Sequence, residues 1–276
     1  MTYGHFGIRI TSRLLNKYEG FCCGPYSLEG ILLMAQDHFK PQPNQVILSS
    51  TLNSTITWLE ALSFAIMTRS SCDESTNPLL TKMAHDLVPF LEFIVGSNVQ
   101  TLDLDVPLVA THVPYTSLPK SIINSCCKVV YICSDPKDCY HRKSSAMEDL
   151  HLEDAFEFFC EGLSSYGPYW DHLLGYWRAS LESPEKILFL KCEDLKNESI
   201  YWVKKMAQFM GYPFSFEKEE KGVNAKSLEV NKSGITQFRA NELTAKNDTF
   251  FMKGKVGDWN NHLTLEMAMQ LDQITK

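Results

Sequence analysis

The sequence predicts an α/β protein built around a central parallel sheet that is flanked by helices. Two observations support this fold class. Four short apolar segments have the length of buried strands, and segments with apolar residues at helical spacing lie between them. Strands that alternate with helices specify parallel pairing with right-handed crossovers. No low-complexity tract or long linker divides the 276 residues, so we expect a single domain over residues 1–276.

The first part of the chain is expected to contain an irregular arm, followed by the first strand and its helix. The arm extends to about Pro43 and includes a short helix, which the apolar spacing between Leu28 and Ala35 indicates. The strand at Val46–Leu48 then leads into a loop rich in Ser, Thr and Asn. The helix after this loop is indicated by three apolar residues at helical spacing, Leu59, Leu62 and Ile66.

The rest of the chain continues the alternation of strands and helices. The three further expected strands are 107–110, 128–133 and 186–191. Periodic apolar residues predict helices over 77–94, 153–163, 169–181, 199–211 and 263–274. Between the last two helices, residues 213–249 are expected to form a loop.

Each expected strand ends in polar residues. These ends are residues 49–57, 111–112, 134–138 and 192–194. The carboxyl ends of parallel strands lie at the same edge of a sheet, and ligands of such proteins bind beyond that edge. We therefore expect the four polar segments to converge on one crevice.

The first of these loops has the features of an anion site. It presents the unpaired backbone N–H groups that begin a helix, and Ser54, Thr55 and Thr57 add hydroxyl donors. The same pattern also fits a capped helix that binds no ligand. The loop lacks GxxxxGK[ST] and GxGxxG, which disfavours a nucleoside triphosphate or dinucleotide site. A P-loop kinase is therefore only a distant alternative, ranked third after the two hypotheses given below.

Composition and charge narrow the possible partners. The net charge of −7 disfavours nonspecific nucleic-acid binding, which needs a basic surface. The chain shows neither a signal-peptide core nor an uncharged apolar segment of 18 residues. The nine cysteines are odd in number and lack CxxC spacing, which is typical of reduced thiols. We expect a cytoplasmic protein that binds neither nucleic acid nor membrane.

Several motifs in order along the chain resemble those of the plant-type cytosolic sulfotransferases. They are EGILLMAQDHFKPQPN, TWLEALSFAIMTR, THVPYTSLPKSI, CKVVYICSDPKD, YGPYWDHLLGYW, ILFLKCEDLK and FFMKGKVGDWNNHLT. The resemblance covers nearly the whole chain and implies one sulfotransferase domain with a P-loop-like strand-loop-helix that binds a phosphosulfate. It also implies transfer of a sulfonate group from 3'-phosphoadenosine 5'-phosphosulfate (PAPS) to a hydroxyl of a small plant metabolite, such as a flavonoid, a steroid or a hormone.

The resemblance assigns roles to individual residues and implies no metal. His112, in THVP, matches the general base that takes the proton of the acceptor hydroxyl, although a lone histidine at a strand end is more often structural. Trp58 matches the tryptophan near the adenine, and Lys253 and Gly254 match the segment that holds the 3'-phosphate. The positions implied for donor binding are Asn53, Ser54, Thr55, Ile56, Thr57, Trp58, Ser134, Lys253 and Gly254.

The donor site departs from the family pattern. Where the family has PKSGTTW, residues 52–58 read LNSTITW, so Asn53 replaces the lysine and Thr55 replaces a glycine suited to close approach. Ser134 and Met252 stand where the family has arginines. Losing two charge-assisted hydrogen bonds to phosphate corresponds to roughly 3 to 6 kcal/mol of donor binding. Arg142 or Lys137 are candidates to compensate.

Two hypotheses of different class follow from these departures. The first is a PAPS-dependent sulfotransferase of low activity, and the second is a catalytically impaired member of the family that folds and binds a small apolar ligand. The animal dimer signature KxxxTVxxxE keeps only Thr264, so the chain is expected to be a monomer or a weak homodimer. Four aromatic residues are candidates for the acceptor pocket or for ordinary packing, namely Phe21, Tyr26, Tyr115 and Tyr166.

Overall fold

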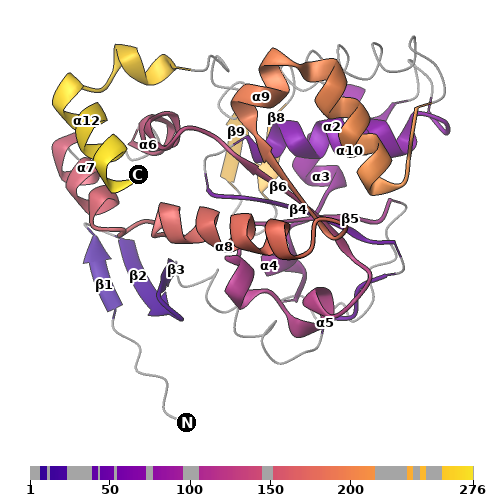
Figure 1. Cartoon of the computed structure of the whole chain (residues 1–276), viewed down its shortest axis with the longest axis horizontal. Helices are drawn as coiled ribbons and strands as arrows, with labels where there is room; N and C mark the ends of the chain where they lie inside the picture. Colours follow the sequence, from indigo (N-terminus) through magenta and orange to yellow (C-terminus); the bar gives the residue numbers. More distant parts are fainter. Residues whose placement is uncertain are drawn as a thin grey trace.

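The structure is a computed structural model of the chain. It describes residues 7–10, 13–23, 39–42, 44–52, 55–72, 77–95, 106–144, 152–214, 235–238, 243–246 and 257–275. The layered arrangement of its helices and strands is shown in Figure 1.

The centre of the fold is a parallel sheet of four strands, as predicted. Its order is β5 (Leu108–Thr111), β4 (Val46–Ser50), β6 (Lys128–Cys133) and β7 (Ile187–Lys191), and every neighbouring pair is parallel. The chain passes from β4 to β5 on one side and then returns to β6 on the other. The order of strands therefore reverses at β4, and the carboxyl end of such a strand is where α/β proteins place ligands.

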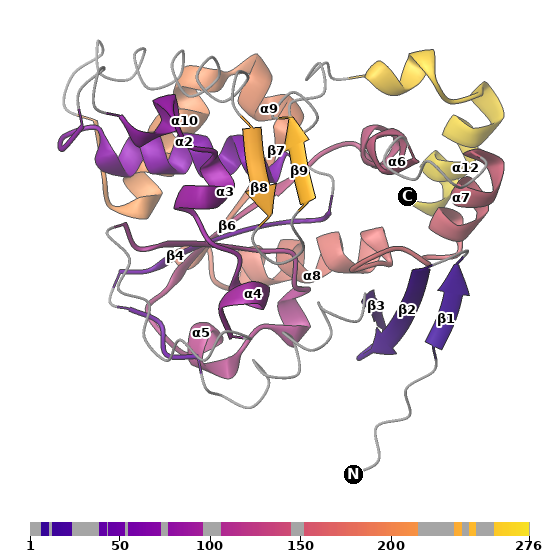
Figure 2. The same ribbon diagram turned by 180° about the vertical axis from the view of Figure 1, so that it is seen from behind.

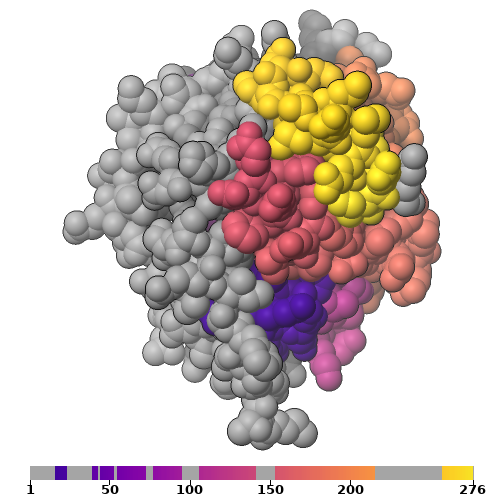
Figure 3. Space-filling model, turned by 90° about the vertical axis from the view of Figure 1, so that its left-hand side faces the viewer, coloured from indigo at the N-terminus to yellow at the C-terminus, as the bar shows by residue number. Residues whose placement is uncertain are grey.

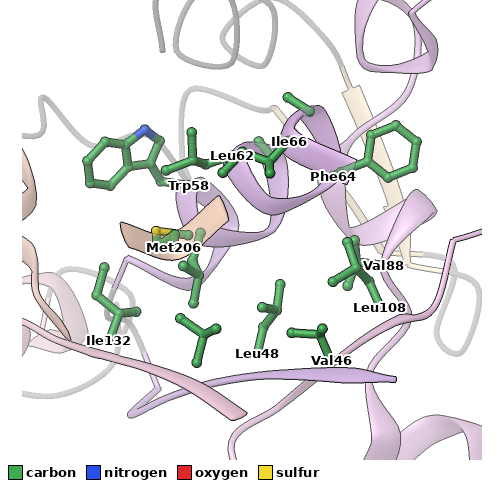
Figure 4. Packing of buried hydrophobic residues seen from close by; sticks show 14 of the residues in the cluster. Val46, Leu48, Trp58, Leu62, Phe64, Ile66, Val88, Leu108, Ile132 and Met206 are labelled. Carbon is green, nitrogen blue, oxygen red and sulfur yellow. The ribbon is translucent and has the colours of Figure 1, made fainter. Parts of the chain in front are cut away.

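One face of the sheet packs against α2 (Ile56–Thr68), α9 (Cys192–Asn197) and α10 (Ser199–Met210). Every residue of α2 is buried, so this helix is apolar nearly all round rather than amphipathic. Figure 4 shows Leu62 and Ile66 of α2 above Val46 and Leu48 of β4. This packing fixes the start of α2 above the carboxyl end of β4.

The opposite face packs against α4 (Leu91–Val95), α5 (Lys120–Ile123) and α8 (Tyr169–Glu182). Strand residues alternate between the two faces, so Ile47 and Tyr131 point to this side. The Tyr131 ring stacks on Tyr176 of α8, with 4.3 Å between ring centroids.

A third cluster joins the C-terminal segment to the end of β6. It contains residues of α6 (Pro136–Ser144), α7 (Leu152–Cys160), α8, and the segment that carries η5 (Asp258–Asn261) and α12 (Leu265–Ile274). Figure 3 shows the C-terminal residues in yellow against the rose-coloured residues of the α6–α7 region. The Asp138 carboxylate accepts hydrogen bonds from the backbone N–H groups of Gly257 and Trp259, at 3.0 and 3.1 Å.

The prediction of an irregular arm is wrong for residues 7–10 and 13–23. They form an antiparallel sheet of β1 (Gly7–Ile10), β2 (Arg13–Tyr18) and β3 (Phe21–Cys23). Glu19 and Gly20 connect β2 to β3 with φ angles of 48° and 92°. Two positive φ angles in a two-residue connection are typical of a hairpin turn that matches the twist of the strands. The short helix expected between Leu28 and Ala35 lies outside the described residues.

Two further expectations need correction. The helix predicted over 77–94 is divided into η1 (Pro78–Leu80), α3 (Ala84–Leu87) and α4. Pro89 accounts for the break between α3 and α4, because a proline cannot continue a helix. The loop expected over 213–249 contains the antiparallel strands β8 (Ile235–Phe238) and β9 (Leu243–Lys246), drawn in Figure 2. The other predicted helices are confirmed within a few residues of their bounds.

A membrane-spanning helix is not found in the described part of the chain, because none of its helices combines the necessary length and apolar character.

Candidate functional site

Direct contacts connect the carboxyl ends of neighbouring strands in two places. Nδ1 of His112, just after β5, lies 2.9 Å from the carbonyl oxygen of Ser50 at the end of β4. The backbone N–H of Asp135, after β6, donates to the Glu193 carboxylate after β7 at 3.0 Å. The expected end of β7 differs in one respect, because Cys192–Asp194 form the first turn of α9 rather than a loop.

The hydrogen bonds of His112 determine its tautomer. A carbonyl oxygen only accepts, so Nδ1 must carry a hydrogen to bond Ser50. In the neutral ring Nε2 then holds the lone pair, and it has no hydrogen-bond partner among the described residues. The His112 side chain is 7% exposed. The ring is therefore arranged to accept a proton at Nε2.

The protonation state of His112 follows from its burial. Burial lowers the pKa of His112 to about 4, while its hydrogen bond to Ser50 opposes that decrease. The ring is consequently neutral near pH 7 and able to act as a base. The proton that it would accept during a reaction therefore needs stabilisation from the surroundings.

Glu92 on α4 binds the backbone of His112. Its carboxylate accepts the His112 backbone N–H at 2.6 Å. Burial raises the pKa of Glu92 to about 7, and the hydrogen bond from His112 limits the increase. This carboxyl group therefore lies close to His112 and titrates near neutral pH.

A second buried histidine holds the backbone of His112 in place. Nε2 of His172 donates to the His112 carbonyl oxygen at 2.9 Å, so Nδ1 accepts the Tyr131 hydroxyl at 3.1 Å. Burial lowers the pKa of His172 to about 4. Tyr176 completes the support, because its hydroxyl donates to the Val113 carbonyl oxygen at 2.8 Å.

Aromatic side chains surround the ring of His112. The rings of Phe90 and Tyr166 lie 5.1 and 5.7 Å from it between centroids. Of the other acceptor-pocket candidates, Phe21 meets the His172 ring edge-on at 6.5 Å and Tyr115 packs on the Tyr176 ring at 5.6 Å. Tyr26, the fourth candidate, is outside the described residues. Tyr166 is thus the candidate that contacts the ring of His112.

The described part of the donor loop begins at Thr55. Thr55 precedes α2 with φ −86°, so its backbone does not need a positive φ at the position where the family has glycine. Ile56 and Trp58 are 5% and 7% exposed and belong to the core around α2, where Figure 4 shows the Trp58 ring. The Thr57 hydroxyl oxygen lies 3.0 Å from Nε2 of His85. The predicted residues Asn53 and Ser54 are outside the described part.

The other predicted donor residues are only partly described. Ser134 is buried at the end of β6, where its carbonyl oxygen accepts the Tyr169 hydroxyl. The Lys137 ammonium lies 2.6 Å from the Asp272 carboxylate and 3.7 Å from that of Asp135, so it forms ion pairs with these two residues. The structure does not describe Lys253, Gly254, Met252 or the side chain of Arg142.

Sequence reasoning missed four residues of this region. Glu92 and Glu60 are acidic residues inside apolar segments, VPFLEF and WLEALSF, and that placement is a readable signal of a buried, partnered carboxylate. His85 and His172 lie in helical segments with no such signal. No group of three His, Cys, Asp or Glu side chains suited to a metal ion occurs among the described residues.

Known proteins provide independent comparisons. The sulfotransferase domain family matches residues 43–276. A flavonol sulfotransferase-like protein of Flaveria bidentis is 47% identical, with 95% of this chain and 89% of the relative covered. Cytosolic sulfotransferase 16 of Arabidopsis thaliana is 42% identical, with 95% and 84% covered. The structure of a mouse sulfotransferase complexed with PAP shares the fold, with a TM-score of 0.73, 21% identity, and 94% and 92% covered. On these matches and on its sheet topology, the chain belongs to the sulfotransferase family.

Proposed function

We propose that the protein transfers a sulfonate group from PAPS to a hydroxyl of a small plant metabolite, with flavonols as the first class to test. The observation that carries the proposal is the position of His112. Its Nε2 lone pair stands at the carboxyl end of β5, and its Nδ1 is bonded to the end of β4, the strand that leads into the donor loop. The name of the Flaveria relative supports the choice of flavonols.

In the proposed reaction, Nε2 of His112 takes the proton of the acceptor hydroxyl while its oxygen attacks the sulfur of the donor. The new bond is between that oxygen and sulfur, and the bond that breaks joins sulfur to the oxygen bridging it to phosphorus. The electron pair of the broken bond leaves with adenosine 3',5'-bisphosphate (PAP). The tautomer fixed by Ser50 leaves Nε2 available for this role. No step of this reaction uses a metal.

We propose that the donor lies along the start of α2, where the unpaired backbone N–H groups of the first turn and the Thr57 hydroxyl would bind its phosphate. Trp58, Ser134, Lys253 and Gly254 are the further candidate contacts, together with residues 53–56. Asn53 and Ser134 supply no charge at positions where the family has cations, so we expect weak donor binding and low activity.

These substitutions also support a second candidate function, in which the fold binds a small apolar ligand without chemistry. The aromatic rings around His112 favour such binding. The two candidates differ in whether the protein binds PAP and whether turnover depends on His112.

We further propose that residues 1–276 act as one domain in the cytosol, as a monomer or a weak homodimer. The family match over residues 43–276 and the cytosolic name of the Arabidopsis relative support this proposal.

The test begins with calorimetric titration of the protein with PAP, which requires no knowledge of the acceptor. Binding in the micromolar range is expected if other residues replace the lost contacts to the donor. Transfer of labelled sulfonate to a panel of flavonols then identifies the acceptor. A folded protein that does not bind millimolar PAP contradicts the proposal and favours the second candidate. Turnover that survives His112→Ala contradicts the assigned base.

A further inference from the structure

A buried carboxylate, an imidazole and a hydroxyl form a chain at the start of α2. The Glu60 carboxylate lies 2.6 Å from Nδ1 of His85 on α3, and Nε2 of the same ring lies 3.0 Å from the Thr57 hydroxyl oxygen. The Glu60 side chain is fully buried and that of His85 is 11% exposed. A carboxylate removed from water in this way requires a cation close by. The proton transfer at His112 does not use this ion pair.

The hydrogen positions in the chain depend on whether His85 is charged. Nδ1 faces a carboxylate oxygen, which only accepts, so Nδ1 carries a hydrogen. In the imidazolium form Nε2 donates to Thr57, whose own hydroxyl hydrogen is then available to an anion. In the neutral form Nε2 accepts that hydrogen, so the hydroxyl presents only lone pairs to a ligand. Only the charged ring makes Thr57 a donor to phosphate.

The groups around His85 favour the charged ring. Burial lowers the pKa of His85, but the charge and hydrogen bond of Glu60 and the charge of Asp86 raise it, and the net shift is upward. Burial raises the pKa of Glu60, which the ion pair with His85 opposes. His112 faces the ring from the end of β5, across the side chain of Phe90, and burial keeps it neutral.

We propose that Glu60 and His85 are positioning residues for the sulfonate donor, which hold the Thr57 hydroxyl with its hydrogen directed at a phosphate oxygen. The inference rests on the donor site proposed at the start of α2. It explains how this chain offsets part of the loss caused by Asn53, which supplies no charge where the family has a lysine. A bound phosphate further favours the imidazolium, so binding takes up a proton above the pKa of His85.

Calorimetric titration with PAP between pH 6 and pH 9 tests the proposal. For the wild type we expect the affinity to decrease as the pH rises through the pKa of His85. Glu60→Gln removes the charge that holds the imidazolium, so we expect its Kd to be about 10-fold to 100-fold higher at pH 7. The affinity of Glu60→Gln for PAP should begin to decrease at a lower pH than the affinity of the wild type does.

A double-mutant cycle separates positioning from general damage to the fold. If Glu60 acts through the hydroxyl, Glu60→Gln in a Thr57→Val background should change the Kd by less than about threefold. Thr68→Val is the matched control, because it removes a buried hydroxyl at the other end of α2, where Thr68 donates to the Phe64 carbonyl oxygen at 2.8 Å. This control should leave the Kd unchanged.

A conservative replacement of the ring provides a variant that does not depend on the Glu60 charge. His85→Gln keeps an N–H donor toward Thr57 at every pH, so it should bind PAP at pH 6 as the wild type does and lose the pH dependence. Thermal unfolding of each variant confirms that it is folded before titration.

Any one of three results overturns the inference. The first is a Kd of Glu60→Gln that equals the wild-type Kd at every pH. The second is an effect of Glu60→Gln that persists in full in the Thr57→Val background, and the third is a His85→Gln protein that keeps the wild-type pH dependence. A wild type that does not bind PAP contradicts the donor site itself. That outcome is distinct, because it appears before any variant is compared.

Discussion

The Glu92→Gln variant should be more stable than the wild type, and only at neutral to alkaline pH. The wild-type carboxyl group is fully buried, and burial raises its pKa from 4.5 to about 7. The folded state therefore holds this proton to a higher pH than the unfolded state does. The stability contributed by the protonated group is fully present below about pH 4.5 and is lost as the pH rises through about 7.

The magnitude follows from the difference between these two pKa values. A difference from 4.5 to about 7 corresponds to roughly 3 kcal/mol of unfolding free energy above pH 7. Glutamine cannot ionise, and its amide oxygen still accepts the His112 backbone N–H that Glu92 binds at 2.6 Å. Because the pKa of about 7 already includes the effect of this hydrogen bond on the carboxylate, the expected net gain is roughly 3 kcal/mol above pH 7 and near zero at pH 4.5.

Urea unfolding at pH 5, 7 and 8.5 measures this effect, with Glu157→Gln on the exposed surface of α7 as the matched control. The stability difference between Glu92→Gln and the wild type should increase with pH, whereas the control should show no such trend. A Glu92→Gln protein that is destabilised equally at every pH would refute the reasoning, because it would mean that the buried carboxylate is stabilised in the folded state rather than penalised.

Further expected outcomes concern the base, its support, the core and the donor loop. His112→Ala should reduce turnover by about 10²-fold to 10⁴-fold with little change in PAP affinity. Because burial lowers the pKa of His112 to about 4, the wild-type kcat/KM should not decline through protonation of this ring between pH 8 and pH 5.5. Tyr131→Phe leaves Nδ1 of His172 without its hydroxyl partner and should cost about 1 to 3 kcal/mol in urea unfolding. Leu62→Ala opens a cavity under α2, where Leu62 is fully buried, and should cost about 2 to 5 kcal/mol by the same measurement. Asn53→Lys should lower the Kd for PAP in calorimetry, and an unchanged Kd would show that this position does not contact the donor.

The central sheet was predictable because its signal is local. Apolar strands such as 128–133 alternate with periodic helices, and parallel pairing follows from the alternation alone. The order of the strands is not local, since it depends on which side of β4 each crossover packs. The N-terminal hairpin was missed because Glu19 adopts a positive φ, although the adjacent Gly20 is the residue that such a turn favours.

The candidate site was predictable only where the chain passes from a strand into a loop. The placement of His112 beside the end of β4 was expected from that rule, and its contact with Ser50 is consistent with it. The partners that hold its backbone come from other elements, since Glu92 lies on α4 and His172 on α8. The apolar residues around Glu92 indicate that it is buried, but its pairing with His112 and the burial of His172 depend on tertiary packing that no spacing pattern reports.

The contact between the N-terminal sheet and the segment before α8 has a practical consequence for shortened forms of the protein. The Cys22 carbonyl oxygen accepts the Tyr166 backbone N–H at 2.6 Å, and the Cys22 N–H donates to the Gly167 carbonyl oxygen at 2.9 Å. Tyr166 in turn lies against the ring of His112. A protein shortened to residues 44–276 would keep every strand of the parallel sheet yet lose the two hydrogen bonds that hold the segment of Tyr166 beside His112. Exchange of the N-terminal hairpin between relatives should therefore change the surroundings of the His112 ring without altering any strand of the parallel sheet.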